Sequence, residues 1–172
     1  SFRPGDILTA NDGTTIEIGN TDAEGRLILA DAIAYAKKEG ASHIVSVATL
    51  TGAAQVALGK IHVPIMGDEK LVRALRQGAT SSGEKVWQLP LDEEHKKMVR
   101  GKVADLTNSD GSGEAGCITA GAFLSHFAGD IPFVHCDISP ASWKNATHEL
   151  GPAGATGVLV TTLVDAFRNW KN

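Results

Sequence analysis

Cysteine and aromatic residues are scarce in this chain. The two cysteines, Cys117 and Cys136, show none of the short spacings typical of zinc-finger sites. Two thiols also cannot build a disulfide scaffold, so the sequence indicates a reducing, cytoplasmic setting. Aromatic residues make up 5% of the chain and never interleave with a basic stripe, and therefore we expect no nucleic-acid partner.

Long hydrophobic runs and a strong excess of one charge are absent as well. No apolar run approaches the roughly 18 uncharged residues of a membrane-spanning helix. The amino terminus lacks the basic-then-apolar order of a signal peptide. The 16 basic and 20 acidic residues give a net charge of −4. We therefore expect a soluble chain without a membrane partner.

Two common hydrolase motifs are missing. The histidines never form a His-Glu-x-x-His pattern and no Gly-x-Ser-x-Gly elbow occurs. The sequence therefore lacks the motifs that zincins and serine hydrolases require. Cys117 stands where a helix is expected to begin, which is one setting for an activated thiol. A small buried core residue is the interpretation that we favour for it.

What the chain does contain is enough apolar sequence for one core. With 42% apolar residues, a chain of 172 residues can bury one sizeable core but is too short for two. We therefore expect a single domain over 1–172. The sequence opens at Ser1 without a methionine and is patterned from the start, which indicates a part of something longer.

The spacing of the apolar residues predicts alternating short strands and helices. A hairpin is expected over 7–18 around Asp12-Gly13, with further strands at 43–48, 61–66, 86–89 and 132–138. Helices are expected at 24–38, after 52, and at 69–81, 92–99, 117–128 and 157–170, the last with Leu159, Leu163, Ala166, Phe167 and Trp170 on its apolar side. Residues 107–116 form a loop too polar for the core, and 139–156 are irregular. This alternation predicts an α/β fold, a mixed and mostly parallel sheet flanked by helices, with ligands held by the loops at 20–26, 49–52 and 139–142.

The most informative stretch, 20–27, puts two carboxylates and a guanidinium at a strand-to-helix junction. One interpretation is structural. Thr21 with Glu24 would form a capping box, and both carboxylates would complement the helix dipole by roughly 0.3–1 kcal/mol each. This interpretation leaves Gly25 unexplained, because glycine in a helix costs up to about 1 kcal/mol relative to alanine. A glycine here suggests that another group approaches the backbone closely.

The other interpretation of this stretch is chemical. Asp22 and Glu24 are hard oxygen ligands for divalent metals, and one carboxylate can bridge two ions that lie roughly 3.5–4 Å apart. Arg26 would supply fixed positive charge for an anion beside the metals. These are the parts that a two-metal hydrolase requires.

A family resemblance favours the chemical interpretation. Asn20-Thr21-Asp22-Ala23-Glu24-Gly25-Arg26-Leu27 resembles, without a departure, the signature octapeptide of the leucine aminopeptidase (cytosol aminopeptidase) family. Further segments resemble the family in the family's order: Arg3-Pro4-Gly5-Asp6, Ala48-Thr49-Leu50-Thr51-Gly52, Trp87-Gln88-Leu89-Pro90-Leu91, Ala104-Asp105, Ile118-Thr119-Ala120-Gly121 and His135-Cys136-Asp137-Ile138. The resemblance runs over nearly the whole chain, as the carboxyl-terminal portion of a catalytic domain.

The resemblance implies metal-dependent release of leucine-like amino-terminal residues from peptides, with two divalent ions, zinc or manganese, as cofactors. At the matching positions, Asp22 would bind one metal through its carboxylate and main-chain carbonyl, and Glu24 would bridge both metals. Arg26 would hold a bicarbonate ion that accepts a proton from the metal-bound water, so Arg26 is catalytic by positioning its partner. The family's catalytic domains pack around the centre of hexamers, which implies a homo-oligomer.

The same resemblance places contacts to the peptide substrate in the next loop. Thr49, Leu50 and Gly52 correspond to residues that contact the substrate's backbone and first side chain. Without the resemblance, these residues would indicate an ordinary strand-to-helix turn. The segment Ser139-Pro140-Ala141 departs from the family's usual Ala-Gly-Thr, which leaves the shape of the side-chain pocket open.

The family's remaining metal ligands, a lysine and two aspartates, and its second catalytic lysine precede the position matched by Ser1. Two carboxylates cannot close a two-metal site, because each ion needs several ligands. We therefore expect the 172 residues alone to be inactive and another chain to carry the missing amino-terminal half. The alternative is a non-catalytic fragment that acts through assembly or interaction.

A third alternative is a dinucleotide-binding oxidoreductase. Residues 111–116 match the fingerprint Gly-x-Gly-x-x-Gly, precede an expected helix, and have Asp137 about 20 residues further on. The glycines follow a polar stretch rather than a strand, and Glu114 would set negative charge against a pyrophosphate. Nicotinamide or flavin chemistry is therefore the weaker prediction.

Overall fold

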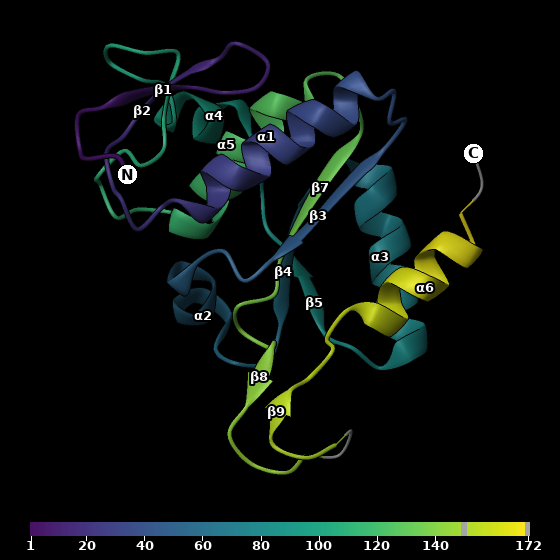
Figure 1. Ribbon diagram of the computed structural model, residues 1–172. Coiled ribbons are helices and arrows are strands. Elements are labelled where there is room, and N and C mark those ends of the chain that lie inside the picture. Colours follow the sequence, from purple (N-terminus) through teal and green to yellow (C-terminus); the bar gives the residue numbers. More distant parts are fainter. Residues whose placement is uncertain (149–150, 171–172) are drawn as a thin grey trace.

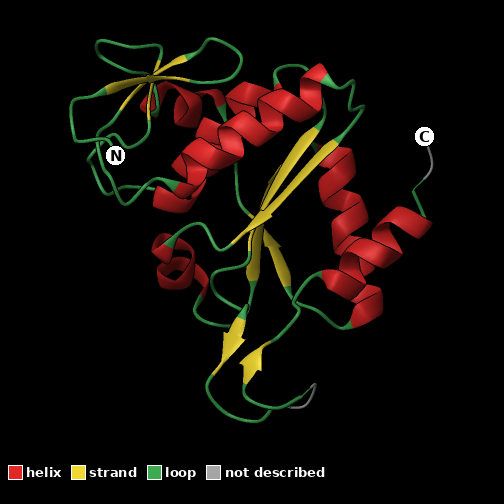
Figure 2. Cartoon of the chain, viewed as in Figure 1, coloured by secondary structure: helices red, strands yellow, loops and turns green. Residues whose placement is uncertain are grey.

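The computed structural model of the chain describes residues 1–148 and 151–170. Figure 2 shows helices and strands in alternation along this chain. The elements are β1 (Ile7–Thr9), β2 (Thr15–Glu17), α1 (Gly25–Lys38), β3 (Ile44–Ala48), α2 (Gly52–Leu58), β4 (Val63–Gly67), α3 (Glu69–Ser82), β5 (Val86–Gln88), α4 (Glu93–Met98), β6 (Leu106–Thr107), α5 (Gly116–Ala128), β7 (Phe133–Asp137), β8 (Trp143–Lys144), β9 (Gly154–Ala155) and α6 (Val160–Arg168).

A four-stranded central sheet has the order β3-β7-β4-β5. β3 pairs with β7 and β4 pairs with β5 in parallel, whereas β4 and β7 run antiparallel. The sequence of β7 is buried throughout, as expected for a strand with neighbours on both edges and both faces covered. The prediction of a mixed, mostly parallel sheet flanked by helices is therefore confirmed.

Helices cover both faces of this sheet (Figure 1). Alternate side chains of a strand point to opposite faces, so Phe133 joins the core under α1 and α5, and Val134 and Cys136 join the core under α3 and α6. Phe123 and Phe127 of α5 lie in the first core with ring centroids 5.3 Å apart. Among the described residues, no helix is long and apolar enough to cross a membrane.

A second, smaller sheet has the order β1-β2-β6. The predicted hairpin around Asp12-Gly13 is confirmed, because β1 and β2 pair antiparallel across that turn. β6 then pairs with β2 in parallel and brings the chain after Leu106 back beside residues 16–20. The prediction that 107–116 stays outside the core is wrong for Thr107 and Asn108, which are buried by this pairing.

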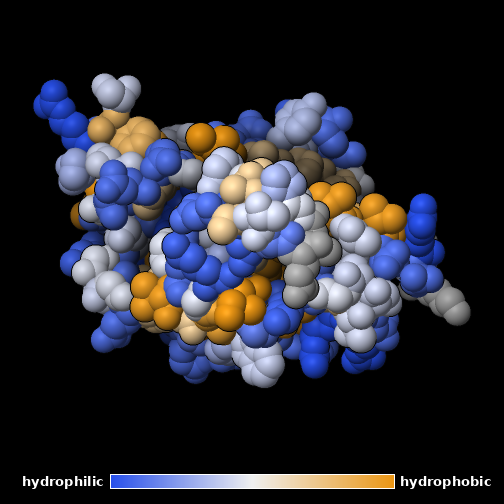
Figure 3. All heavy atoms as spheres, turned by 90° about the horizontal axis from the view of Figure 1, so that it is seen from below, coloured by the Kyte–Doolittle hydropathy of each residue, from blue (hydrophilic) through white to orange (hydrophobic). Residues whose placement is uncertain are grey.

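The carboxyl-terminal part departs from the sequence pattern in two places. Residues 139–156, expected to be irregular, contain the short antiparallel pair β8-β9, which projects from the body of the molecule (Figure 1). The last helix is shorter than predicted, and Phe167, placed on its apolar side, is 55% exposed. Figure 3, a view from the β8-β9 side, shows hydrophobic patches scattered over a largely hydrophilic surface.

Candidate functional site

The two carboxylates of the signature stretch lie in the loop between β2 and α1. Asp22 and Glu24 are both exposed, and within the described residues no hydrogen bond or ion pair engages either carboxylate. α1 begins at Gly25, and its amino-terminal capping residue, Glu24, makes no side-chain capping bond. The capping box between Thr21 and Glu24 is therefore wrong, because Glu24 already has helical backbone angles and Thr21 stands too far from the first turn.

Asn108, which sequence reasoning missed, holds this loop in shape. Its side-chain oxygen accepts hydrogen bonds from the backbone N–H groups of Gly19 at 2.8 Å and Asn20 at 3.2 Å. Its amide nitrogen donates to the carbonyl oxygens of Asn20 at 2.7 Å and Ala23 at 3.3 Å. Asn108 is completely buried. No local pattern marks it, since its partners lie up to 89 residues away in the sequence.

Arg26 projects from the first turn of α1 into partly buried surroundings. One terminal nitrogen, Nη1, donates to the carbonyl oxygen of Asn108 at 2.8 Å. Its Nε is buried and has no hydrogen-bond partner among the described residues. Burial lowers the pKa of the guanidinium, while the charges of Asp110 and Asp137 act in the opposite direction. A buried donor on a cationic group without a partner suits the binding of a small anion.

The predicted substrate loop, 49–52, is held by hydrogen bonds to the carboxylate of Asp137, at the end of β7. This carboxylate accepts hydrogen bonds from the backbone N–H groups of Leu50 at 3.0 Å and Thr51 at 2.9 Å, and from the Thr51 hydroxyl at 2.7 Å. Ser139 also donates to it through its hydroxyl. Thr51 in turn caps α2 by accepting from Ala54 N at 3.1 Å. Thr49 and Gly52 remain exposed at the surface of this loop.

The signature loop and the substrate loop lie side by side. A Cβ atom placed on Gly25 would stand 3.4 Å from Cδ1 of Leu50. A Cβ atom at that distance would make an ordinary van der Waals contact, so the approach of Leu50 does not explain why residue 25 is glycine. The structure therefore brings the predicted ligand residues and Leu50 together in one region.

Two buried cysteines and a buried histidine lie on β7 and at the start of α5. Burial raises the pKa of Cys117 to about 12, with the charge of Asp137 acting in the same direction. Cys117 is therefore a protonated core residue, as favoured from the sequence, and no activated thiol. Burial also raises the pKa of Cys136 to about 12 and lowers that of His135 to about 4.

The dinucleotide interpretation does not hold in the structure. Asp137, its expected ribose partner, is completely buried and its carboxylate is engaged by the 49–52 loop and Ser139. The glycine-rich loop follows β6, a two-residue strand of the small sheet, rather than a strand of the central sheet. A dinucleotide would therefore find neither the crevice nor the acidic partner that it requires.

Across residues 1–148 and 151–170, no group of three or more His, Cys, Asp or Glu side chains is placed to hold a metal ion. Asp22 and Glu24 thus stand as an open pair of carboxylates.

Known proteins resemble this chain in fold and in sequence. The structure of the bottromycin maturation enzyme BotP superposes with a TM-score of 0.90 at 35% sequence identity, over 96% of this chain and 37% of that enzyme. The chain therefore spans well under half the length of that enzyme. Residues 1–164 match the model of the cytosol aminopeptidase family, catalytic domain. The chain belongs to the cytosol aminopeptidase family and contains part of its catalytic domain.

Proposed function

We propose that this chain supplies one side of a two-metal aminopeptidase site. Asp22 and Glu24 are its metal-binding carboxylates, and Arg26 is its anion-binding, catalytic residue. The site is completed by a part of the enzyme that carries further ligands, and the complete enzyme removes leucine-like residues from the amino termini of peptides. We also propose that the complete enzyme is a homo-oligomer and acts in the cytoplasm.

The exposure of two unengaged carboxylates at a shaped loop is the observation that carries the proposal. Carboxylates at the start of a helix usually serve the helix, by capping it or by complementing its dipole. Here neither side chain caps α1. Asn108 meanwhile fixes the backbone on both sides of Asp22 through bonds to Asn20 and Ala23. A loop that a buried residue holds in shape, and whose carboxylates make no bond within the described residues, is consistent with a ligand-binding role for those carboxylates.

Zinc or manganese, when bound, would lower the pKa of a water molecule and polarise the peptide carbonyl. The residues of this chain have the donor types for that role, since carboxylate oxygens bind either ion. Asp22 and Glu24 would hold the metals. Arg26 would hold bicarbonate through its unpartnered Nε beside the same loop, and the bicarbonate would supply a proton acceptor there.

The substrate side of the proposal rests on the neighbouring loop. Thr49 and Gly52 are exposed and offer backbone groups to an extended peptide. Leu50 places an apolar side chain beside Gly25, where the first side chain of a leucine-like substrate would be received. The three hydrogen bonds from Leu50 and Thr51 to Asp137 keep this loop rigid.

The test measures hydrolysis of leucine p-nitroanilide with manganese or zinc, by this chain alone and by the chain combined with a complementary part of the catalytic domain that supplies the remaining ligands. We expect activity in the combination only. Asp22→Asn and Glu24→Gln should each lower kcat/KM by about a hundredfold or more. Added bicarbonate should raise the rate of the parent combination and leave an Arg26→Ala combination unchanged.

Matched controls are Asp130→Asn and Glu39→Gln, because both carboxylates are exposed and Glu39 lies at the opposite end of α1 from Glu24. They should keep the parent rate. Full activity of the 172 residues alone, or parent rates for Asp22→Asn and Glu24→Gln in the combination, would show that the ligand assignment is wrong.

A further inference from the structure

The central sheet ends at β5, and no further strand pairs with that edge in the described part of the chain. Toward β4, Lys85 O accepts from Val63 N and Leu89 N donates to Ile65 O, both at 2.9 Å. Backbone groups alternate in direction along a strand, so Val86 and Gln88 turn their N–H and C=O groups toward the open edge. These groups are positioned to pair with an added strand.

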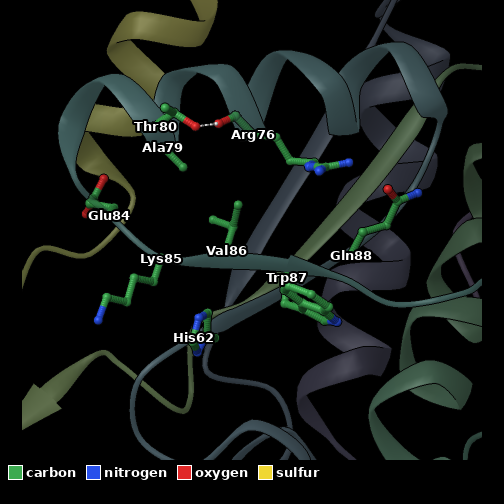
Figure 4. Close-up of a pocket in the computed structure, with 9 residues that line it drawn as sticks. All are labelled: His62, Arg76, Ala79, Thr80, Glu84, Lys85, Val86, Trp87 and Gln88. Atoms are coloured by element: carbon green, nitrogen blue, oxygen red, sulfur yellow. Dashed lines mark hydrogen bonds between the residues drawn. The ribbon is translucent and has the colours of Figure 1, made fainter.

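A cavity of about 370 Å³ lies along this edge. Figure 4 shows Val86 pointing toward Ala79 and Thr80 of α3, while Lys85 and Trp87 point to the other side of the strand. Trp87 is 59% exposed, and its ring stands 6.4 Å from that of His62, edge to face. The groove therefore offers apolar contacts on both faces of an added strand.

Both basic and acidic side chains lie along this groove, and the carboxylate of Glu69 accepts a hydrogen bond from Nε2 of Gln88 at 3.0 Å. Arg76 and Lys85 are exposed, and among the described residues neither side chain forms an ion pair. The one carboxylate of the lining, Glu84, is engaged by α6, where it accepts from Leu159 N at 2.6 Å and the Thr162 hydroxyl at 2.6 Å. The groove thus attracts negative charge.

We propose that the open edge of β5 binds an extended acidic peptide segment of a partner protein, which adds a strand to the central sheet. Main-chain bonds to Val86 and Gln88 provide the pairing, and Trp87 provides an apolar contact. Arg76 and Lys85 select acidic side chains. β3, the strand at the opposite end of the sheet, has no charged residue within Ile44–Ala48 and lacks this selectivity. The site is separate from the proposed aminopeptidase function.

The probe is a fluorescein-labelled octapeptide with the repeat Val-Glu-Glu-Val, which puts valines and glutamates on both faces of an added strand. It is titrated with the 172-residue chain and followed by fluorescence anisotropy. We expect saturable binding that weakens as salt is added. Arg76→Glu combined with Lys85→Glu should weaken it about tenfold or more, because two attractive pairs become repulsive. Arg100→Glu combined with Lys102→Glu has the same net charge away from the groove and should bind like the parent.

Two further peptides separate strand pairing from simple charge attraction. The same octapeptide methylated on alternate backbone nitrogens should lose binding, as should one with lysine in place of every glutamate. Circular dichroism checks that each variant is folded. The proposal is overturned by absence of saturable binding, by equal affinity for the Arg76 and Lys85 double variant, or by binding of the methylated peptide. A parent chain that sediments as a dimer, with the Arg76→Glu, Lys85→Glu variant sedimenting as a monomer, would overturn it too, because a second copy of the chain would then occupy the edge.

Discussion

Two polar side chains of β7, His135 and Asp137, are completely buried and are accommodated differently. Asp137 is surrounded by N–H and O–H donors from residues 50, 51 and 139. His135 has one polar contact, between Nδ1 and the Ser46 hydroxyl at 3.2 Å, and its Nε2 has no partner among the described residues. Burial lowers the pKa of His135 to about 4, so the ring is neutral near pH 7.

This histidine should make the stability of the chain depend on pH. The pKa of His135 falls from 6.5 to about 4 on folding, so the unfolded chain binds the proton first as the pH drops. The free energy of unfolding should therefore decrease between pH 6.5 and 4, by about 3 kcal/mol in total from this residue. Urea unfolding at several pH values measures the slope.

In the variant His135→Gln, the free energy of unfolding should decrease less between pH 6.5 and 4 than in the parent chain. His126→Gln is the matched control, since His126 is exposed and should leave the slope unchanged. Parallel curves for the parent and His135→Gln would contradict the assignment.

At the scale of elements, α6 depends on a residue outside itself. Its capping residue, Leu159, has φ +70 and offers no side-chain cap. Glu84, in the connection between α3 and β5, accepts from Leu159 N and Thr162 N at the start of the helix, and from the Thr162 hydroxyl. One carboxylate thus satisfies backbone donors and complements the helix dipole from 75 residues away.

Glu84→Ala should lower the free energy of unfolding by about 2 kcal/mol or more, because the backbone N–H groups of Leu159 and Thr162 would lose their acceptor and the Thr162 hydroxyl would keep only Ser82. Glu84→Gln should cost less, since its amide oxygen can still accept one bond. Urea unfolding provides the free energies, and limited proteolysis should show earlier cleavage in α6. Glu114→Ala, at an exposed glutamate, is the control; equal losses in both alanine variants would refute the role of Glu84.

At the scale of the whole molecule, the helices and strands that follow from the spacing of apolar residues could be predicted from the sequence. The central strands and the helices at 24–38 and 69–81 follow from apolar spacing, and the structure matches them within a few residues. The β6 pairing, the β8-β9 pair and the exposure of Phe167 depend on contacts across the fold, which local patterns do not encode. The spacing of Asp22 and Glu24 left both a helix cap and a metal site open, and the metal site stays a prediction. Asn108 could not be found from the sequence, because its role exists only once two distant segments meet.

The side chain of Asn108 links the small sheet to the signature loop, and its removal should loosen both. Asn108→Ala leaves the N–H groups of Gly19 and Asn20 and the carbonyl of Ala23 without their partner, at a cost of about 2–4 kcal/mol. Urea unfolding measures the loss, and hydrogen exchange at the two amides should become faster. Asn145→Ala, at an exposed asparagine, should change neither; unchanged exchange in Asn108→Ala would refute the link.

The distance along the chain between Asn20 and Asn108, 88 residues, also sets an order of events during synthesis. The hairpin β1-β2 needs only neighbouring residues and can form as soon as they leave the ribosome. The loop after it takes its final shape only when Asn108 has been made and has returned to meet it. The carboxylates that we propose as ligands are therefore presented to metal late, by a chain whose core is already being assembled.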